Sequence, residues 1–248
     1  MKAMVLAAGL GTRLRPLTDD RPKALVEVGG RTMLEITLAR LREFGIREVI
    51  VNAHHFGDQI AAYLNANGGF GMRIEVSRED VLLDTGGGLK KAAHFFLGGS
   101  SSAGEPFILH NVDVISTIDL RRMADSHAEH QRLATLAVQQ RETSRYLLFD
   151  DKLQLCGRRA GREQQDEIVR RSPLLTPLAF CGIHVISPRI FSLMTETGAF
   201  SIINVYLRLA AAGDKITAFR ADQSYWRDLG KPEQVKQAAA DMKQGAIR

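Results

Sequence analysis

The first 25 residues, MKAMVLAAGLGTRLRPLTDDRPKAL (residues 1–25), contain the stretch that decides the fold, because an apolar strand runs directly into a glycine-containing loop. Residues 4–6, Met-Val-Leu, have the pattern of a short buried strand. The positions after it carry almost no side chain: Ala7, Ala8, Gly9 and Gly11. A ligand can therefore come close to their backbone N–H groups, and several such groups in one concavity attract an anion. This segment predicts a phosphate-binding loop.

The charged residues of the same segment favour a ligand with more than one phosphate group. Four cations stand against two carboxylates, namely Arg13, Arg15, Arg21 and Lys23 against Asp19 and Asp20. Guanidinium and ammonium groups both bind phosphate oxygens well. We therefore expect a triphosphate.

The glycine spacing excludes two common nucleotide-binding motifs. The dinucleotide motif G-x-G-x-x-G would need a third glycine where the chain has Leu14, and no G-x-x-x-x-G-K-[ST] sequence occurs anywhere. The segment therefore supports neither a dehydrogenase nor a P-loop NTPase.

The composition indicates a soluble enzyme with small anionic substrates. A chain of 248 residues that is 45% hydrophobic can bury the core of one large domain. Its N-terminal apolar run, about seven residues long, is too short for a signal peptide or a membrane span. Cys156 and Cys181 have no metal-site or redox spacing, so we expect free thiols and a cytoplasmic protein. The net charge of +5 comes from scattered arginines without interleaved aromatic residues, which argues against nucleic acid as a partner.

Strand-like and helix-like patterns alternate along the first half of the chain. The predicted strands are residues 4–6, 49–51, 73–76 and 107–109, and the predicted helices are residues 36–44, residues 60–64 and one that begins after Gly88. This alternation predicts the α/β class, as a Rossmann-like three-layer α/β/α fold with a mixed, mostly parallel central sheet. Ligands bind such sheets beyond the carboxyl ends of the strands, so the residues after Leu6, Val51 and Leu109 should meet there.

The pattern changes from residue 140 onward. Residues 143–156 read as a hairpin, residues 157–172 as a mobile loop or sheet edge, and residues 174–186 as a strand through the core. A helix near 202–212, a strand at 216–219 and a helix after Pro232 follow. We expect a single domain over residues 1–248. Within it, residues 1–139 would mainly bind the nucleotide, residues 140–225 would form an insertion that faces a sugar, and residues 226–248 would close the site.

The sequence His110-Asn111-Val112-Asp113 follows the predicted strand 107–109. A strand end that delivers a carboxylate to this edge of the sheet is typical of a magnesium ligand or a base beside phosphates. Asp113 is the candidate for this role, and a solvated aspartate without a role is the alternative. In the same way, the strand 49–51 delivers Asn52, His54 and His55 to the ligand edge.

Three successive glycines, Gly86–Gly88, stand before the helix predicted to follow Gly88. Glycines lose much conformational entropy on folding, so this cluster indicates that the backbone approaches something flat or bulky. A nucleobase fits that description.

These motifs together resemble the sugar-1-phosphate nucleotidyltransferases. The family signature L-A-A-G-x-G-T-R-L-x-P-L-T, followed by P-K, corresponds to residues 6–18 and then Pro22-Lys23. The family's N-[GS]-D corresponds to residues 111–113, and its W-x-D-x-G-[TK]-P to residues 226–232. The resemblance spans most of the chain. It implies that an NTP and a sugar 1-phosphate react, with Mg²⁺, to give an NDP-sugar and pyrophosphate, in the supply of nucleotide sugars for cell-envelope polysaccharide.

The resemblance also implies roles for individual residues. Arg13 would steady the leaving pyrophosphate, Lys23 would meet the α-phosphate, and Asp113 and Asp228 would share one Mg²⁺. Nucleotide contacts are implied for Leu6, Ala7, Ala8, Gly9, Gly11, Thr12, Arg13, Asp84, Thr85, Gly86 and Gly87. Sugar contacts are expected from Asn52, His54, Asn111, Tyr146, Gly182 and Lys231. From the sequence alone, Asp228 could equally cap the last helix, although Pro232 favours a later start.

The chain departs from the family pattern at two places. Val112 stands where a small residue is usual, which would tighten the space at the ligand. The Glu-Lys-Pro triplet, whose lysine grips the sugar phosphate in many relatives, is missing, and Lys152, Arg158 and Lys231 are the candidate replacements.

The substrates stay open. Residues 83–89 resemble the N-acetylmuramate 1-phosphate uridylyltransferases, whereas residues 143–150 and 201–216 resemble the guanylyltransferases of heptose and mannose 1-phosphates. The sugar, the base and the oligomeric state are therefore left undecided. Cytidylyl transfer to phosphocholine is an alternative that would need an aromatic box. A non-catalytic nucleotide sensor is another, against which the retained Gly11, Arg13, Lys23, Asp113 and Asp228 argue.

Overall fold

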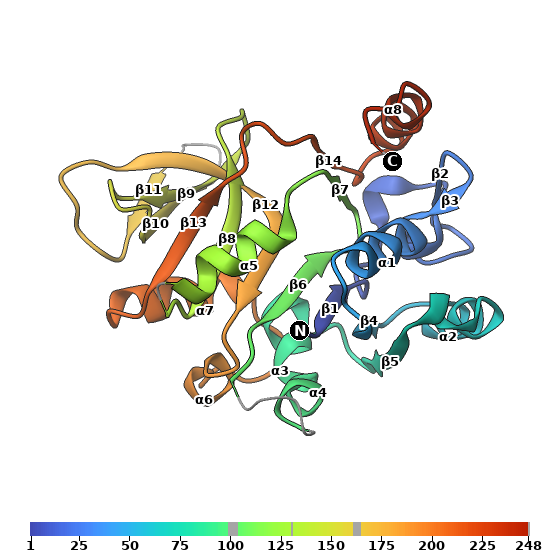
Figure 1. Cartoon of the computed structure of the whole chain (residues 1–248), viewed down its shortest axis with the longest axis horizontal. Coiled ribbons are helices and arrows are strands. Elements are labelled where there is room, and N and C mark those ends of the chain that lie inside the picture. Colours follow the sequence, from blue (N-terminus) through green and yellow to red (C-terminus); the bar gives the residue numbers. More distant parts are fainter. Residues whose placement is uncertain (99–103, 130, 161–164, 248) are drawn as a thin grey trace.

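The computed structural model describes the whole chain except residues 99–103, 130, 161–164 and 248 (Figure 1). The strands are β1 (Ala3–Leu6), β2 (Glu27–Val28), β3 (Arg31–Thr32), β4 (Glu48–Ala53), β5 (Arg73–Arg78), β6 (Phe107–Asn111), β7 (Val114–Ser116), β8 (Ala134–Gln139), β9 (Arg145–Phe149), β10 (Leu155–Ala160), β11 (Gln165–Ile168), β12 (Thr176–Ile186), β13 (Ile216–Arg220) and β14 (Trp226–Asp228). The α-helices are α1 (Met33–Glu43), α2 (Gly57–Ala66), α3 (Asp84–Lys91), α4 (Ala93–Leu97), α5 (Leu120–Glu129), α6 (Ile190–Leu193), α7 (Ile202–Ala211) and α8 (Pro232–Lys243). Short 3-10 helices occupy Thr12–Leu14, Lys23–Leu25 and Gly68–Gly71.

One large mixed sheet runs through the molecule in the order β11-β10-β9-β12-β6-β1-β4-β5, with β8 also paired to β12 and β13 to β8. Strand β1 lies in parallel between β4 and β6, with Leu6 level with both Asn52 and Asn111. Strand β12 runs antiparallel to β6, β8 and β9, so the two halves of the sheet differ in direction. The carboxyl ends of β1, β4 and β6 therefore come together at one edge.

Helices cover both faces of the sheet, as the three-layer prediction requires (Figure 1). The alternation of β1 shows the two faces directly, because side chains of a strand point alternately to opposite sides. Ala3 and Val5 pack with α1, α2, α5 and α8, whereas Met4 and Leu6 pack with α3, α4, α6 and α7. Each side is a buried apolar core, which makes the ligand edge of the sheet a rigid platform.

Helix α1 supports the segment that carries Asp113. It begins at a capping residue, Thr32, whose hydroxyl accepts a hydrogen bond from the Glu35 N–H at 3.0 Å. Its buried face meets the turn after β6, where the Thr37 hydroxyl donates to the Val112 carbonyl oxygen at 3.5 Å. Val112 itself is fully buried in the core. The expectation that Val112 tightens the ligand space is therefore wrong, because its side chain packs behind the site.

Several predicted elements are confirmed. Strands β9 and β10 form the hairpin, β12 is the long core strand, and β11 is the edge strand of the sheet. The predicted helix start after Gly88 is wrong, because α3 begins at Asp84 and includes the three glycines. The division of the chain into nucleotide-facing, sugar-facing and closing segments stays a prediction. Within the residues that the model describes, no helix is both long and apolar enough to cross a bilayer.

Candidate active site

A cavity of about 370 Å³ opens where β1, β4 and β6 end. It is lined by Leu6, Ala8, Gly9, Lys23, Asn52, Leu82, Asp84, Thr85, Asn111, Asp113 and Ala199. Nine of these eleven lining residues are predicted site residues, since only Leu82 and Ala199 are additional. The fold thus gathers residues from six separate stretches of the chain around one cavity, at the place where α/β sheets bind ligands.

The loop after β1 presents its backbone to this cavity. The Ala7 N–H donates to the Asn52 Oδ1 atom at 2.7 Å, which fixes the start of the loop. The N–H groups of Ala8, Gly9, Leu10 and Gly11 find no protein acceptor within the described part of the chain. Gly11 has a left-handed backbone with a φ of 65°, and a Cβ atom there would come within 2.9 Å of the Thr18 side chain. Free amides on a tightly folded loop are suited to bind phosphate oxygens.

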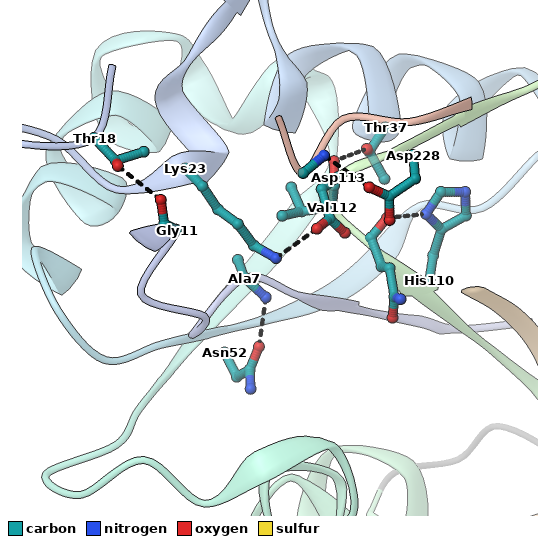
Figure 2. A network of polar contacts seen from close by, with 12 residues as sticks. Ala7, Gly11, Thr18, Lys23, Thr37, Asn52, His110, Val112, Asp113 and Asp228 are labelled. Carbon is teal, nitrogen blue, oxygen red and sulfur yellow. Dashed lines mark hydrogen bonds and ion pairs between the residues drawn. The ribbon is translucent and has the colours of Figure 1, made fainter. Parts of the chain in front are cut away.

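Lys23 reaches over this loop to Asp113 (Figure 2). Its ammonium group donates to the Asp113 Oδ2 atom at 2.8 Å, and the two side chains are only 16% and 11% exposed. The absence of a side chain at Gly9 makes room for Lys23, since a Cβ atom there would lie 3.2 Å from Lys23 Nζ. A cation and a carboxylate that neutralise each other inside the cavity are both available to an incoming anion and its metal.

Asp228 is brought beside Asp113 by pairing of β14 with β7 (Figure 2). Asp228 lies opposite Val114, and the next N–H, that of Leu229, donates to the Asp113 carbonyl oxygen at 2.8 Å. The Asp228 Oδ1 atom accepts from the Gly230 N–H at 2.8 Å, and Gly230 also packs against the Arg13 guanidinium. Lys231 caps α8, with Pro232 in its first turn, so Asp228 is not the helix cap.

The two carboxylates suit magnesium that arrives with a nucleotide. In the residues that the structure describes, no group of three or more His, Cys, Asp or Glu side chains could hold a metal ion by itself. Magnesium is commonly bound by one or two carboxylates together with substrate phosphates and water. Asp113 and Asp228 form a donor set of this kind.

The glycines of α3 pack against protein. A Cβ atom at Gly86 would lie 2.5 Å from the Phe200 ring, and one at Gly87 would lie 2.5 Å from the Gly198 carbonyl oxygen. The N–H groups of Gly86 and Gly87 both donate to the Phe200 carbonyl oxygen, at 2.8 and 3.2 Å. The close approach predicted from the sequence is therefore explained by the segment before α7, and Asp84 and Thr85 are the members of this segment that line the cavity. Contact of Gly86 and Gly87 with a base stays a prediction.

The predicted sugar contacts fall into two groups. Asn52 and Asn111 line the cavity, and Gly182, with a φ of 73°, packs closely behind the Asn111 amide. His54 follows the end of β4, two residues after Asn52, and its Nδ1 atom is hydrogen-bonded to the Glu79 carbonyl oxygen at 2.7 Å. Tyr146 and Lys231 lie outside the cavity lining. The Tyr146 hydroxyl instead accepts from the Thr143 N–H at 3.2 Å.

Arg141 lies beside the Trp-x-Asp motif, outside the cavity lining, at a place that the sequence did not reveal. Its guanidinium carbon lies 3.7 Å from the centre of the Trp226 ring, and its charge interacts with the Asp228 carboxylate. Its Nη2 atom donates to the Phe180 carbonyl oxygen at 2.8 Å, but it forms no ion pair with a carboxylate among the described residues. Arg158, in contrast, is paired with Glu167 at 2.7 Å. Only the pairing of distant strands brings Arg141 to the Trp-x-Asp motif, so no local signal could have identified it.

His110 is buried beneath the end of β6 and does not line the cavity. Its side chain is buried, and its Nδ1 atom must donate to the Asn111 carbonyl oxygen at 2.8 Å, because that oxygen can only accept. Burial lowers the pKa of His110 to about 4, so the ring is neutral at physiological pH. The residue next to Asn111 thus supports the strand end and leaves the cavity to amides, Lys23 and carboxylates.

Comparison with known proteins agrees with this geometry. The family model described as nucleotidyl transferase matches residues 2–149. N-acetylmuramate alpha-1-phosphate uridylyltransferase of Caulobacter vibrioides is 35% identical, over 96% of this chain and 94% of that protein. Mannose-1-phosphate guanylyltransferase of Mycobacterium tuberculosis is 28% identical over 98% of this chain, which spans 65% of that protein.

Solved structures share the fold at lower identity. HddC from Yersinia pseudotuberculosis, complexed with GMP-PN, has a TM-score of 0.75 and 21% identity, over 97% of this chain and 99% of that chain. An apo UDP-glucose pyrophosphorylase has a TM-score of 0.79 and 17% identity, over 99% of each chain. The strand-end cavity, the phosphate loop and these matches lead to one conclusion: the chain belongs to the nucleotidyl transferase family.

Proposed function

We propose that this chain transfers a nucleotidyl group from an NTP to a sugar 1-phosphate and releases pyrophosphate. One observation carries this proposal: the free amides of Ala8 and Gly9, the Lys23 ammonium and the Asp113 carboxylate border one cavity, and its described lining residues include no histidine or cysteine. A sugar phosphate is already anionic at neutral pH and needs no base to attack. Positioning and charge neutralisation are then sufficient for catalysis.

The reaction requires an in-line exchange at the α-phosphorus. A phosphate oxygen of the sugar forms a new bond to that phosphorus, the bond to the bridging oxygen of the β-phosphate breaks, and its electron pair leaves with pyrophosphate. Lys23 would shift from Asp113 to the reacting phosphate, and Arg13, beside Asp228, would stabilise the leaving group. Mg²⁺ held by Asp113 and Asp228 would supply further neutralisation of the phosphate oxygens.

Arg141 is our candidate for the cation that holds the sugar phosphate in place of the missing lysine. A half-buried guanidinium without a carboxylate partner among the described residues favours an anion, and Trp226 fixes its orientation. Arg141→Ala should raise the KM for sugar 1-phosphate roughly tenfold, with the KM for NTP little changed. The matched control is Arg158→Ala, whose partner is Glu167, and equal effects of the two variants would contradict this role.

The relative of Caulobacter vibrioides, named for N-acetylmuramate 1-phosphate and uridylyl transfer, suggests the first substrates to test. We propose UTP with N-acetylmuramate 1-phosphate, and GTP with mannose or heptose 1-phosphate as the rival pair that the guanylyltransferase relatives suggest. The experiment is a matrix of UTP, GTP, CTP and ATP against these sugar phosphates and glucose 1-phosphate, with phosphocholine as a non-sugar acceptor. Pyrophosphate release and the mass of the product are the readouts. NTP binding without pyrophosphate release from any pair would instead support a non-catalytic nucleotide sensor.

A further inference from the structure

Asn52 and Glu79 form a buried link between the phosphate loop and the opposite wall of the cavity. The Asn52 Oδ1 atom accepts from the Ala7 N–H at 2.7 Å, and its Nδ2 atom donates to the Glu79 Oε1 atom at 2.7 Å. The other carboxylate oxygen of Glu79, Oε2, accepts from the Leu83 N–H at 3.0 Å. Three hydrogen bonds thus connect the loop after β1 to the residue just before α3.

The link is sealed from water and from ligands on one side. Asn52 is 2% exposed and Glu79 is 4% exposed. Gly88 covers the contact between them, because a Cβ atom there would lie 2.7 Å from Glu79 Oε1 and 2.8 Å from Asn52 Nδ2. Glu79 forms no ion pair with a cation among the described residues, so these hydrogen bonds are what satisfies its carboxylate. A buried polar pair of this kind holds its neighbours in one geometry, since leaving either partner unsatisfied is costly.

The two ends of the link are the two walls between which a nucleotide would lie. At one end are the free amides that follow Ala7, and at the other are the cavity-lining residues Leu82, Asp84 and Thr85 that flank Leu83. We propose that Asn52 and Glu79 are a positioning pair that sets the separation of these walls and thereby the affinity for NTP. This role rests on the proposed nucleotidyl transfer. It also gives Asn52 a different function from the sugar contact expected from the sequence, because both of its polar atoms are engaged by protein.

The pair can be tested by exchanging the amide and the carboxylate between positions 52 and 79. In Glu79→Gln, the new amide group donates, so it leaves either the Leu83 N–H or the Asn52 Nδ2 atom facing another donor. In Asn52→Asp, two carboxylates face each other, and their repulsion persists until one of them is protonated. The double variant Asn52→Asp/Glu79→Gln restores all three bonds. Its new carboxylate at position 52 accepts from the Ala7 N–H and from the new amide at position 79, whose oxygen accepts from the Leu83 N–H. Its net charge equals that of the parent chain.

The experiment measures NTP binding by calorimetry for the parent, both single variants and the exchange variant, with the melting temperature of each. We expect each single change to weaken NTP binding by roughly tenfold or more, and the exchange to return it to within about threefold of the parent. The loss in Asn52→Asp should shrink as the pH is lowered from about 8 to about 6, because a shared proton relieves the repulsion. Glu75→Gln is the matched control, since Glu75 lies on β5, which ends at Arg78 just before Glu79, and its side chain is 43% exposed; this variant should bind NTP normally.

Kinetics separate this role from general support of the fold. With the single variants, the KM for NTP should rise while the KM for sugar 1-phosphate stays within about twofold. Losses that add in the exchange variant, or single variants that bind NTP as the parent does, would overturn the positioning pair. If the single variants have lowered melting temperatures, the positioning pair is still tested, because the double variant must then recover both stability and NTP binding. Pyrophosphate release by the parent tests the proposed function separately. A parent that binds NTP without turnover would contradict that function. The positioning pair would still be supported if the double variant recovered NTP binding.

Discussion

Two glycine-rich segments border the same cavity, yet they use their glycines differently. Residues 8–11 leave their N–H groups without a protein acceptor among the described residues, so the backbone is available to phosphate. Residues 86 and 87 give their N–H groups to the Phe200 carbonyl oxygen, and their missing side chains make room for the protein itself. Glycine content therefore shows only that something approaches closely. The acceptors of the N–H groups show whether that neighbour is a ligand or another part of the chain.

The largest effect that we predict tests the cation beside the first segment. Lys23→Ala should lower kcat by roughly 10²-fold or more, because it removes positive charge from the reacting phosphate. The melting temperature should fall as well, because the buried Asp113 loses its ion-pair partner, so kcat is measured well below that temperature. Lys215→Ala, at an exposed position just before β13, is the control and should leave kcat unchanged. A kcat within about threefold of the parent would mean that the loop does not act on phosphate.

The second prediction concerns the metal beside the same segment. Asp113→Asn and Asp228→Asn should each raise the Mg²⁺ concentration for half-maximal activity by about tenfold or more. The double variant should lose little more than the worse single variant, because residues that act as one unit are not additive. The measurement is a Mg²⁺ titration of initial rate at saturating NTP. Fully multiplicative losses would show that the two carboxylates have separate roles.

The third prediction is a small change in the first glycine segment. Gly9→Ala adds a Cβ atom 3.2 Å from Lys23 Nζ, the mobile end of a flexible side chain, so Lys23 should shift without loss of stability. We expect kcat to fall roughly tenfold, because a displaced charge serves the phosphate less well. Steady-state kinetics together with thermal melting check this. A lowered melting temperature with normal kcat would show that Gly9, like Gly86 and Gly87, makes room for the protein and not for a ligand.

The smallest effect on activity is expected in the second segment. Gly87→Ala adds a Cβ atom 2.5 Å from a backbone oxygen, which cannot move as a side chain does. The overpacking costs about 1–3 kcal/mol, and the better helix propensity of alanine offsets up to about 1 kcal/mol of it. The melting temperature should therefore fall by a few degrees while kcat stays within about threefold of the parent. Gly57→Ala, with an ordinary contact at 3.4 Å, is the matched control and should melt no lower than the parent. If Gly87→Ala blocks NTP binding at unchanged stability, the base lies against this glycine after all.

The sequence was sufficient to predict the elements that depend on local pattern. The apolar run 4–6, the glycines after it and the cations up to Lys23 predicted a phosphate loop at a strand end, because each of these signals lies within a few residues. The alternation of strands and helices predicted the layered α/β fold. Because ligands bind such folds at the carboxyl ends of the strands, Asp113 could be predicted to lie at the same edge of the sheet as the phosphate loop. The start of α3 was mispredicted, because glycine is unfavourable inside a helix and only the packing against Phe200 explains its presence there.

The tertiary structure decided which of these residues act on one another. Lys23 and Asp113 are 90 positions apart in sequence, and Asn52 and Glu79 are 27 apart. Local sequence patterns could therefore not predict either contact. Arg141 reaches Trp226 only because distant strands pair around β12. Local sequence determines where strands end and which side chains stand there. The pairing of distant strands in the sheet then decides which of those side chains meet, because a hydrogen bond or ion pair forms only between groups that the packed fold holds within about 3 Å of each other.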